Sequence, residues 1–199
     1  MGLDYSYEIF MPARNVAKAL TLLADLAPRD RGTPPLPVTL PGGERLTVPF
    51  TSRFSSEPVD CSAGGTLELD LVVMIGVDDA VREFHLSVFD RVDASGRAPV
   101  GCIYLTVRFS PAWHPDFASL QFTAATSGMS RMFEQSANVR KVFTELTAAA
   151  GGACCVLDTE TDTFDICWLN GEAISGETVP GARFPRFHDL VTAWREPAG

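Results

Sequence analysis

Apolar and polar residues alternate in several short stretches of the chain, which is the pattern of strands with one buried face. The clearest stretches are residues 66–75 and 100–109, and similar alternation marks residues 4–11 and 119–125. Residues 45–50 alternate as well, but Pro49 would remove a ladder hydrogen bond and predicts a strand at a sheet edge. Residues 83–92 also predict a strand, although a helical period fits them in part. Short turns between these strands favour antiparallel neighbours.

Two longer stretches have the period of an amphipathic helix. Residues 13–27 carry one apolar stripe between Pro12 and Pro28, which suit the start and the end of a helix. Residues 127–150 keep apolar side chains three or four positions apart until Gly151 and Gly152 end the period. Ser136 would suit the cap of a second segment and so divide this helix in two. Residues 28–43 are too rich in proline and glycine for regular structure.

A hairpin over residues 153–170 follows the longer helix, with an acidic turn at its tip. Its apolar side chains are Cys154, Val156, Phe164, Ile166 and Trp168. They share one face only if the numbers of the two residues in each cross-strand pair sum to 322. That register centres the loop on Thr161 and places Cys155 opposite Cys167 on the other face. A short apolar pattern in residues 183–195 predicts a terminal helix that packs on the sheet.

These elements predict a single α+β domain over residues 1–199, with an antiparallel or mixed sheet covered by two main helices and a short C-terminal helix. Strand, helix, strand and strand follow one another in both halves of the chain, residues 1–110 and 117–199. This order resembles the βαββ units of tandem ferredoxin-like folds. The halves share no visible sequence identity, so the resemblance concerns topology and carries over no functional residues.

Composition narrows the class of protein. An apolar fraction of 46% in 199 residues is enough for a substantial core, yet no apolar run approaches the roughly 18 residues that span a bilayer. The first residues lack a basic segment followed by an apolar block, so we expect a cytoplasmic protein without a secretory signal. Five cysteines, odd in number and without a C-x-x-C motif, predict reduced thiols.

The charge is distributed very unevenly. The net charge is −9, but residues 54–81 hold six acidic and no basic side chains, and residues 142–182 hold seven acidic and none basic. The rest of the chain is therefore slightly basic. A protein that binds nucleic acid would carry a basic stripe, so nucleic acid is not an expected partner. The acidic tracts suit either a basic protein partner or simple solubility.

Motifs with specific chemistry are weak in this sequence. Asp158, Glu160 and Asp162 have the spacing that begins a calcium loop, but Thr163 stands where glycine is needed and Leu169 where a bidentate glutamate is needed. Cys155 and Cys167 would suit a redox pair or a soft-metal site, but neither hairpin strand adds a histidine. Two buried thiols are the simpler interpretation. We expect no metal and no cofactor.

Three functional hypotheses follow. The first is a non-enzymatic interaction protein, regulatory or inhibitor-like, that meets a basic partner through an acidic face made by Asp158, Glu160, Asp162, Asp165, Glu68 and Asp70. The second is a small-molecule binding protein or enzyme with a pocket between sheet and helices, lined by Trp113, His114, Arg131 and Arg183. The third is thiol redox or soft-metal chemistry at Cys155 and Cys167. The sequence does not indicate an oligomeric state.

Overall fold

The structure is a computed structural model, which describes residues 2–29, 34–84, 92–109, 116–181, 190–192 and 194. Its helices are the 3-10 helix η1 (Ala13–Asn15), then α1 (Val16–Asp25), α2 (Asp79–Phe84), α3 (Ser127–Gln135) and α4 (Ala137–Ala150). Its strands are β1 (Ser6–Pro12), β2 (Leu36–Thr39), β3 (Arg45–Val48), β4 (Val59–Asp60), β5 (Thr66–Gly76), β6 (Arg97–Phe109), β7 (Phe117–Ala124), β8 (Cys154–Asp158), β9 (Thr163–Leu169), β10 (Glu172–Ala173) and β11 (Thr178–Pro180).

Most strands form one eight-stranded antiparallel sheet in the order β10-β9-β8-β1-β7-β6-β5, with β11 also paired to β9. We call this the main sheet. Its large antiparallel character confirms the α+β class that the sequence predicts. β1 lies between β7 and β8, so the first strand of the chain pairs with strands more than a hundred residues away.

A second, three-stranded sheet has the order β3-β2-β4. It differs from expectation in two ways: β2 lies inside the proline-rich stretch taken for a loop, and β3 does not join the main sheet. β4 pairs only with Val38 and Thr39 of β2, so Pro37 has no neighbour on the β4 side. The N–H group that a proline lacks is therefore not needed there for a ladder hydrogen bond. With β3 in this sheet and β1 between β7 and β8, the arrangement does not divide into two βαββ units.

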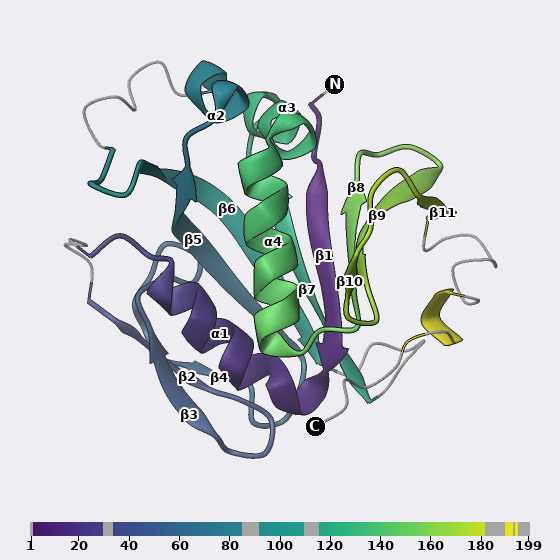
Figure 1. Cartoon of the computed structure of the whole chain (residues 1–199). Helices are drawn as coiled ribbons and strands as arrows, with labels where there is room; N and C mark the ends of the chain where they lie inside the picture. The colour runs from purple at the N-terminus through teal and green to yellow at the C-terminus, as the bar shows by residue number, and fades with distance from the viewer. Residues whose placement is uncertain are drawn as a thin grey trace.

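One face of the main sheet packs against α1, α4 and the small sheet, and we call it the covered face. In Figure 1, α4 crosses in front of the strands with α1 beside it. Tyr7 from β1 stacks on Phe143 from α4 at 4.4 Å between ring centroids, and Phe133 and Phe122 pack against the same ring. These aromatic side chains are almost fully buried and form the centre of the larger hydrophobic core.

The long helical stretch is divided at Ser136, as one of the two sequence interpretations allowed. The Ser136 side chain accepts a hydrogen bond from the Val139 amide and caps α4. Asp78, before α2, accepts bonds from the Ser136 hydroxyl at 2.7 Å and from the Asn138 amide at 3.1 Å. Gly151 ends α4 in the left-handed conformation, with φ 71°. The junction therefore ties together the starts of α2 and α4.

The prediction of a strand over residues 83–92 is wrong for its first two residues. Glu83 and Phe84 belong to α2, which begins beside Asp78, where the Val81 amide donates to the Asp78 carboxylate at 3.0 Å. Residues 85–91 lie outside the described residues. An acidic side chain before a partly helical period is a helix start, and here that local signal prevails over the strand alternation.

The C-terminal segment contributes to a smaller core on the opposite side of the main sheet. Residues 190–192 are helical, and Leu190, Val191 and Trp194 pack with Phe10 and Phe117. The Trp194 ring stacks on Phe10 at 4.6 Å between centroids. This part of the tail therefore packs on the sheet as the sequence predicts, against side chains of β1, β8 and β9.

Candidate interaction surface

One side of the main sheet faces away from α4, and the smaller core covers part of it. The part that this core leaves uncovered carries polar side chains on five adjacent strands. We call it the open face, made of Ser6, Glu8, Glu68, Asp70, Tyr104, Thr106, Arg108, Gln121, Thr123 and Asp158. One row across the strands runs from Asp158 through Ser6, Thr123 and Tyr104 to Asp70. Four strand spacings make this row about 19 Å long. Both of its ends are acidic.

A tight turn stands at the β5 end of the open face. Ser52 and Ser55 exchange backbone hydrogen bonds at 2.8 and 2.9 Å, so Arg53 and Phe54 occupy the central positions of the turn. Both have left-handed backbones, with φ 49° and φ 60°. Glycine and asparagine are the usual residues at such positions, and an arginine followed by a phenylalanine costs conformational energy there.

Asp70 holds this turn against β5. Its Oδ2 atom accepts hydrogen bonds from the Thr51 hydroxyl at 2.9 Å and from the Phe54 amide at 2.6 Å. The Asp70 amide in turn donates to the Thr51 carbonyl at 2.7 Å. Glu68 binds the other central residue, since the Arg53 Nε atom lies 2.8 Å from Glu68 Oε2. Both acidic residues that the sequence singles out on β5 therefore position this turn.

The turn presents Phe54 to solvent. The side chain is 76% exposed, and its ring meets the 39% exposed Tyr104 ring edge-on at 6.5 Å. Phe54, Tyr104, Asp70, Thr106 and neighbouring atoms line an open cleft of about 330 Å³. Sequence reasoning missed Phe54 because it lies in a polar loop without a periodic pattern. Two exposed aromatic rings beside a carboxylate are typical of a binding surface.

Glu8 occupies the centre of the open face and is mostly covered, with 17% of its side chain exposed. Burial raises the pKa of Glu8, while the Ser119 hydroxyl and Arg108 act in the opposite direction. The Arg108 Nη1 atom lies 3.9 Å from the Glu8 carboxylate and donates to the Gln121 side chain at 3.0 Å. The centre of the face is thus a connected group of polar side chains rather than an apolar patch.

The acidic residues of the β8–β9 hairpin separate into three positions. Asp158 belongs to the open face, and Glu160 and Asp162 lie in the turn beyond it. Asp165 pairs with Leu157 and points to the covered face. Asp70 and Asp165 therefore lie in one sheet but on opposite faces, so the six acidic residues expected to share a surface do not all do so.

A β-bulge alters the expected hairpin register. Pairs from Val156–Ile166 to Asp158–Phe164 follow the predicted sum of 322, but beyond the bulge Cys155 pairs with Trp168 instead of Cys167. The extra residue turns both Cys167 and Trp168 toward the covered face. The prediction that Trp168 shares the face of Cys154 and Val156 is therefore wrong.

Cys155 and Cys167 nevertheless meet in the larger core, where both are fully buried. Burial raises the pKa of Cys155, and the hydrogen bond that this thiol donates lowers the pKa of Cys167. The positive charge of Arg140 also lowers the pKa of Cys167. The Arg140 side chain donates hydrogen bonds to the Ile166 and Ile174 carbonyls at 3.1 and 3.2 Å. In the part of the chain that the structure describes, no three His, Cys, Asp or Glu side chains gather as a metal site.

The residues of the expected pocket are only partly described. Trp113, His114 and Arg183 lie outside the described residues. Arg131 lines an open cleft of about 650 Å³ between α2 and α3, together with Glu83, Phe84 and Gln135. This cleft is polar and lies at one end of the helices, away from the space between sheet and helices where the pocket was expected.

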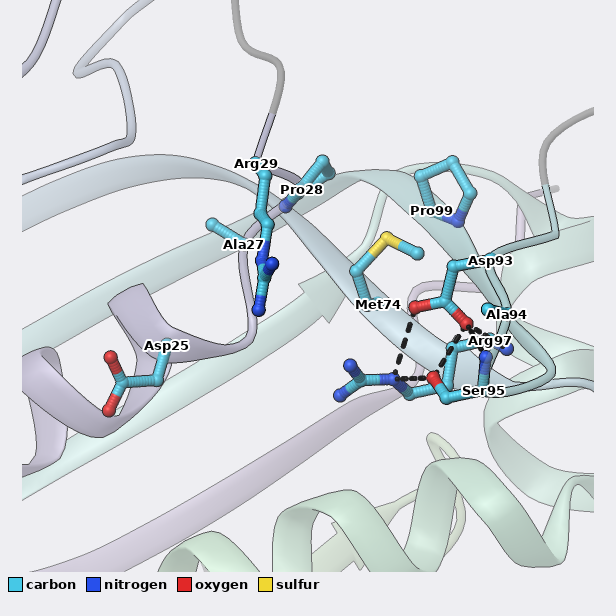
Figure 2. Close-up of a pocket in the computed structure, with 10 residues that line it drawn as sticks. All are labelled: Asp25, Ala27, Pro28, Arg29, Met74, Asp93, Ala94, Ser95, Arg97 and Pro99. Carbon is cyan, nitrogen blue, oxygen red and sulfur yellow. Dashed lines mark hydrogen bonds and ion pairs between the residues drawn. The ribbon is translucent and has the colours of Figure 1, made fainter.

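A larger open cleft of about 680 Å³ lies between the end of α1 and the turn before β6 (Figure 2). Its polar groups are engaged locally. Hydrogen bonds from Ser95 and Arg97 lower the pKa of Asp93 to about 2, and the Arg97 Nε atom donates to the Ser95 hydroxyl at 2.9 Å. Asp93, Ser95 and Arg97 thus stabilise the turn, and Arg29 remains exposed at the rim.

The comparisons with known proteins leave the structure as the main guide to function. No family model, no curated protein and no solved structure matches the chain. In the described residues, no helix is long and apolar enough to cross a membrane.

Proposed function

We propose that this protein is a non-enzymatic, regulatory or inhibitor-like binding protein that docks a basic protein partner on the open face. The observation that carries the proposal is the strained turn that holds Phe54 out in solvent beside Tyr104. Folding alone would favour a glycine at this left-handed position. It would also favour burial of a phenylalanine side chain in the core. A residue kept in this state at an energetic cost is a candidate anchor for a partner.

Charge supports a basic partner. Asp158 stands at one end of the open face and Glu68 and Asp70 at the other, while Glu160 and Asp162 extend the acidic edge at the β8–β9 turn. Arg53 and Arg108 offset part of this charge, but the net charge of the chain is −9. Complementary charge at the rim raises association rates, and the aromatic pair would provide the buried contact. We place this binding in the cytoplasm, where the five thiols would remain reduced.

The small-molecule alternative has weaker support. The clefts of about 680 and 650 Å³ are open, and the polar groups in the cleft of Figure 2 already bind one another. Ligand pockets usually enclose most of their ligand and present polar groups that converge on it.

The test is a capture experiment from lysate of the source cells with a matched pair of variants. Thr106→Arg places a bulky cation in the middle of the open face, and Thr178→Arg makes the same change at an exposed position on β11. We expect Thr106→Arg to abolish capture of a partner that the wild type and Thr178→Arg retain, with equal melting temperatures for both variants. Equal capture by the two variants would contradict docking on this face.

A second arm tests the acidic hairpin. Replacing Asp158, Glu160 and Asp162 by Asn or Gln should slow capture at low salt and leave little difference at high salt, because screening already removes the charge effect there. Adding Asp165→Asn should change nothing further, since Asp165 points to the covered face. Unchanged capture rates at every salt concentration would mean that the hairpin acids serve only solubility.

A further inference from the structure

The cleft between Phe54 and Tyr104 has hydrogen-bonding capacity that the fold does not use. Both bonds that Asp70 accepts go to Oδ2, and among the described residues nothing donates to Oδ1. The Tyr104 hydroxyl also has no hydrogen-bond partner among them. A free carboxylate oxygen and a free hydroxyl oxygen therefore stand beside two aromatic rings in one cleft.

This combination suits a positive charge. Aromatic faces attract cations, and a carboxylate oxygen accepts hydrogen bonds from a cationic donor. Glu68 already binds Arg53 at 2.8 Å, so among the described residues Asp70 is the carboxylate of this cleft that has no cation beside it. A planar guanidinium stacks on aromatic rings and donates several parallel hydrogen bonds, which a compact ammonium group does less well.

We propose that this cleft binds an arginine side chain of the basic partner. The inference rests on the proposed function and makes it more specific. The guanidinium stacks on the exposed Phe54 ring, which stands edge-on to Tyr104, and donates to Asp70 Oδ1 and to the Tyr104 hydroxyl. Arg53 stays paired with Glu68 and forms one wall of the cleft. The strained turn then has a purpose, because it places the Phe54 ring opposite Tyr104.

The experiment measures binding of a fluorescein-labelled hexa-arginine peptide by fluorescence anisotropy at low salt. Phe54→Leu keeps the charge and an apolar side chain but removes the ring, and it should weaken binding about three- to fivefold. Asp70→Asn, checked for an unchanged melting temperature, should weaken it by a similar factor. The control is Glu177→Gln, which removes one exposed negative charge beside β11 and should change binding less than twofold.

Three results would overturn the inference. If Phe54→Leu binds like the wild type, the aromatic ring takes no part. If Asp70→Asn and Glu177→Gln have equal effects, the peptide senses only net charge. If hexa-lysine binds as tightly as hexa-arginine, the cleft does not select a guanidinium.

The capture assay separates this inference from the proposed function. Loss of capture with Thr106→Arg together with full capture by Phe54→Leu would support docking on the open face and reject the arginine cleft. Capture that survives both variants would reject both.

Discussion

The two faces of the main sheet are built from the same strands and differ in what their alternate residues do. On the covered face, Tyr7, Phe122 and Phe143 pack their rings together with almost no exposure. On the open face, the neighbouring residues Glu8 and Gln121 join a polar group around Arg108. The covered face is organised by close packing, whereas the open face is organised by hydrogen bonds and by one strained turn. Changes on the two faces should therefore have different kinds of consequence.

Thiol labelling should show the largest contrast. Cys102 is exposed, whereas Cys61, Cys154, Cys155 and Cys167 are buried. A bulky maleimide should modify Cys102 within minutes and the other four only through unfolding, more slowly by a factor of about a thousand or more. Mass spectrometry of partly labelled protein checks this expectation. Rapid labelling of Cys155 or Cys167 would mean that the hairpin opens by itself, which redox chemistry at that pair would require.

Core truncation should show the largest energetic contrast. Phe143→Ala removes the ring at the centre of the aromatic cluster and should cost about 3–5 kcal/mol of unfolding free energy. Tyr104→Ala on the open face should cost less than about 1 kcal/mol, because that ring is partly exposed. Urea titrations measure both values. A loss below about 1 kcal/mol for Phe143→Ala would refute the assignment of the covered face.

Asp78 links two helices on the covered side and should confer stability that depends on pH. Burial disfavours its charge, but hydrogen bonds from Val81, Ser136 and Asn138 outweigh that effect and lower the pKa of Asp78 below its ordinary 3.8. A lowered pKa gives stability that is complete above the ordinary value and is lost as the pH falls through the folded value. Asp78→Ala should cost about 2 kcal/mol at pH 7 and progressively less under acid conditions. Thermal melts from pH 2 to 7 test this trend, and an equal cost throughout would contradict it.

The strained turn offers a change that should stabilise the fold. Phe54→Gly accepts φ 60° without steric cost and should raise the unfolding free energy by about 1 kcal/mol while removing the proposed anchor. Phe54→Ala serves as the control, because it also removes the ring but keeps the backbone strain. A destabilised Phe54→Gly variant would show that the ring contributes to folding and would weaken its interpretation as a binding residue.

Glu8 should show the opposite pH trend from Asp78. Burial raises the pKa of Glu8 above its ordinary 4.5, so its favourable contribution is complete below that value and is lost as the pH rises through the folded pKa. Glu8→Gln should therefore be more stable than the wild type at pH 7, by about 1 kcal/mol or less, and should lose this advantage near pH 4. Denaturant midpoints at the two pH values decide the sign. A less stable variant at pH 7 would mean that the Arg108 contact outweighs burial.

The covered face was more accessible to sequence analysis than the open face. Alternation in residues 66–75 and 100–109 identified β5 and β6 with their inward side chains, because burial demands apolar residues at every second position. Alternation cannot reveal what the outward residues contact. The turn at Phe54, the pairing of β1 with β7 and β8, and the bulge at Cys167 depend on contacts between distant segments. A local sequence pattern therefore cannot predict these features. It also cannot predict that β3 belongs to a separate sheet.

The position of β1 has a consequence for the order of events during synthesis. Its partners Phe117–Ala124 and Cys154–Asp158 emerge from the ribosome long after Ser6–Pro12. Until then the most buried strand of the protein has neither neighbour, and its apolar side chains remain available to chaperones or to other chains. Closure of the main sheet must wait until Cys154–Asp158 has been synthesised, so folding should be slow. A chain truncated before β8 would lack a neighbour for its own first strand.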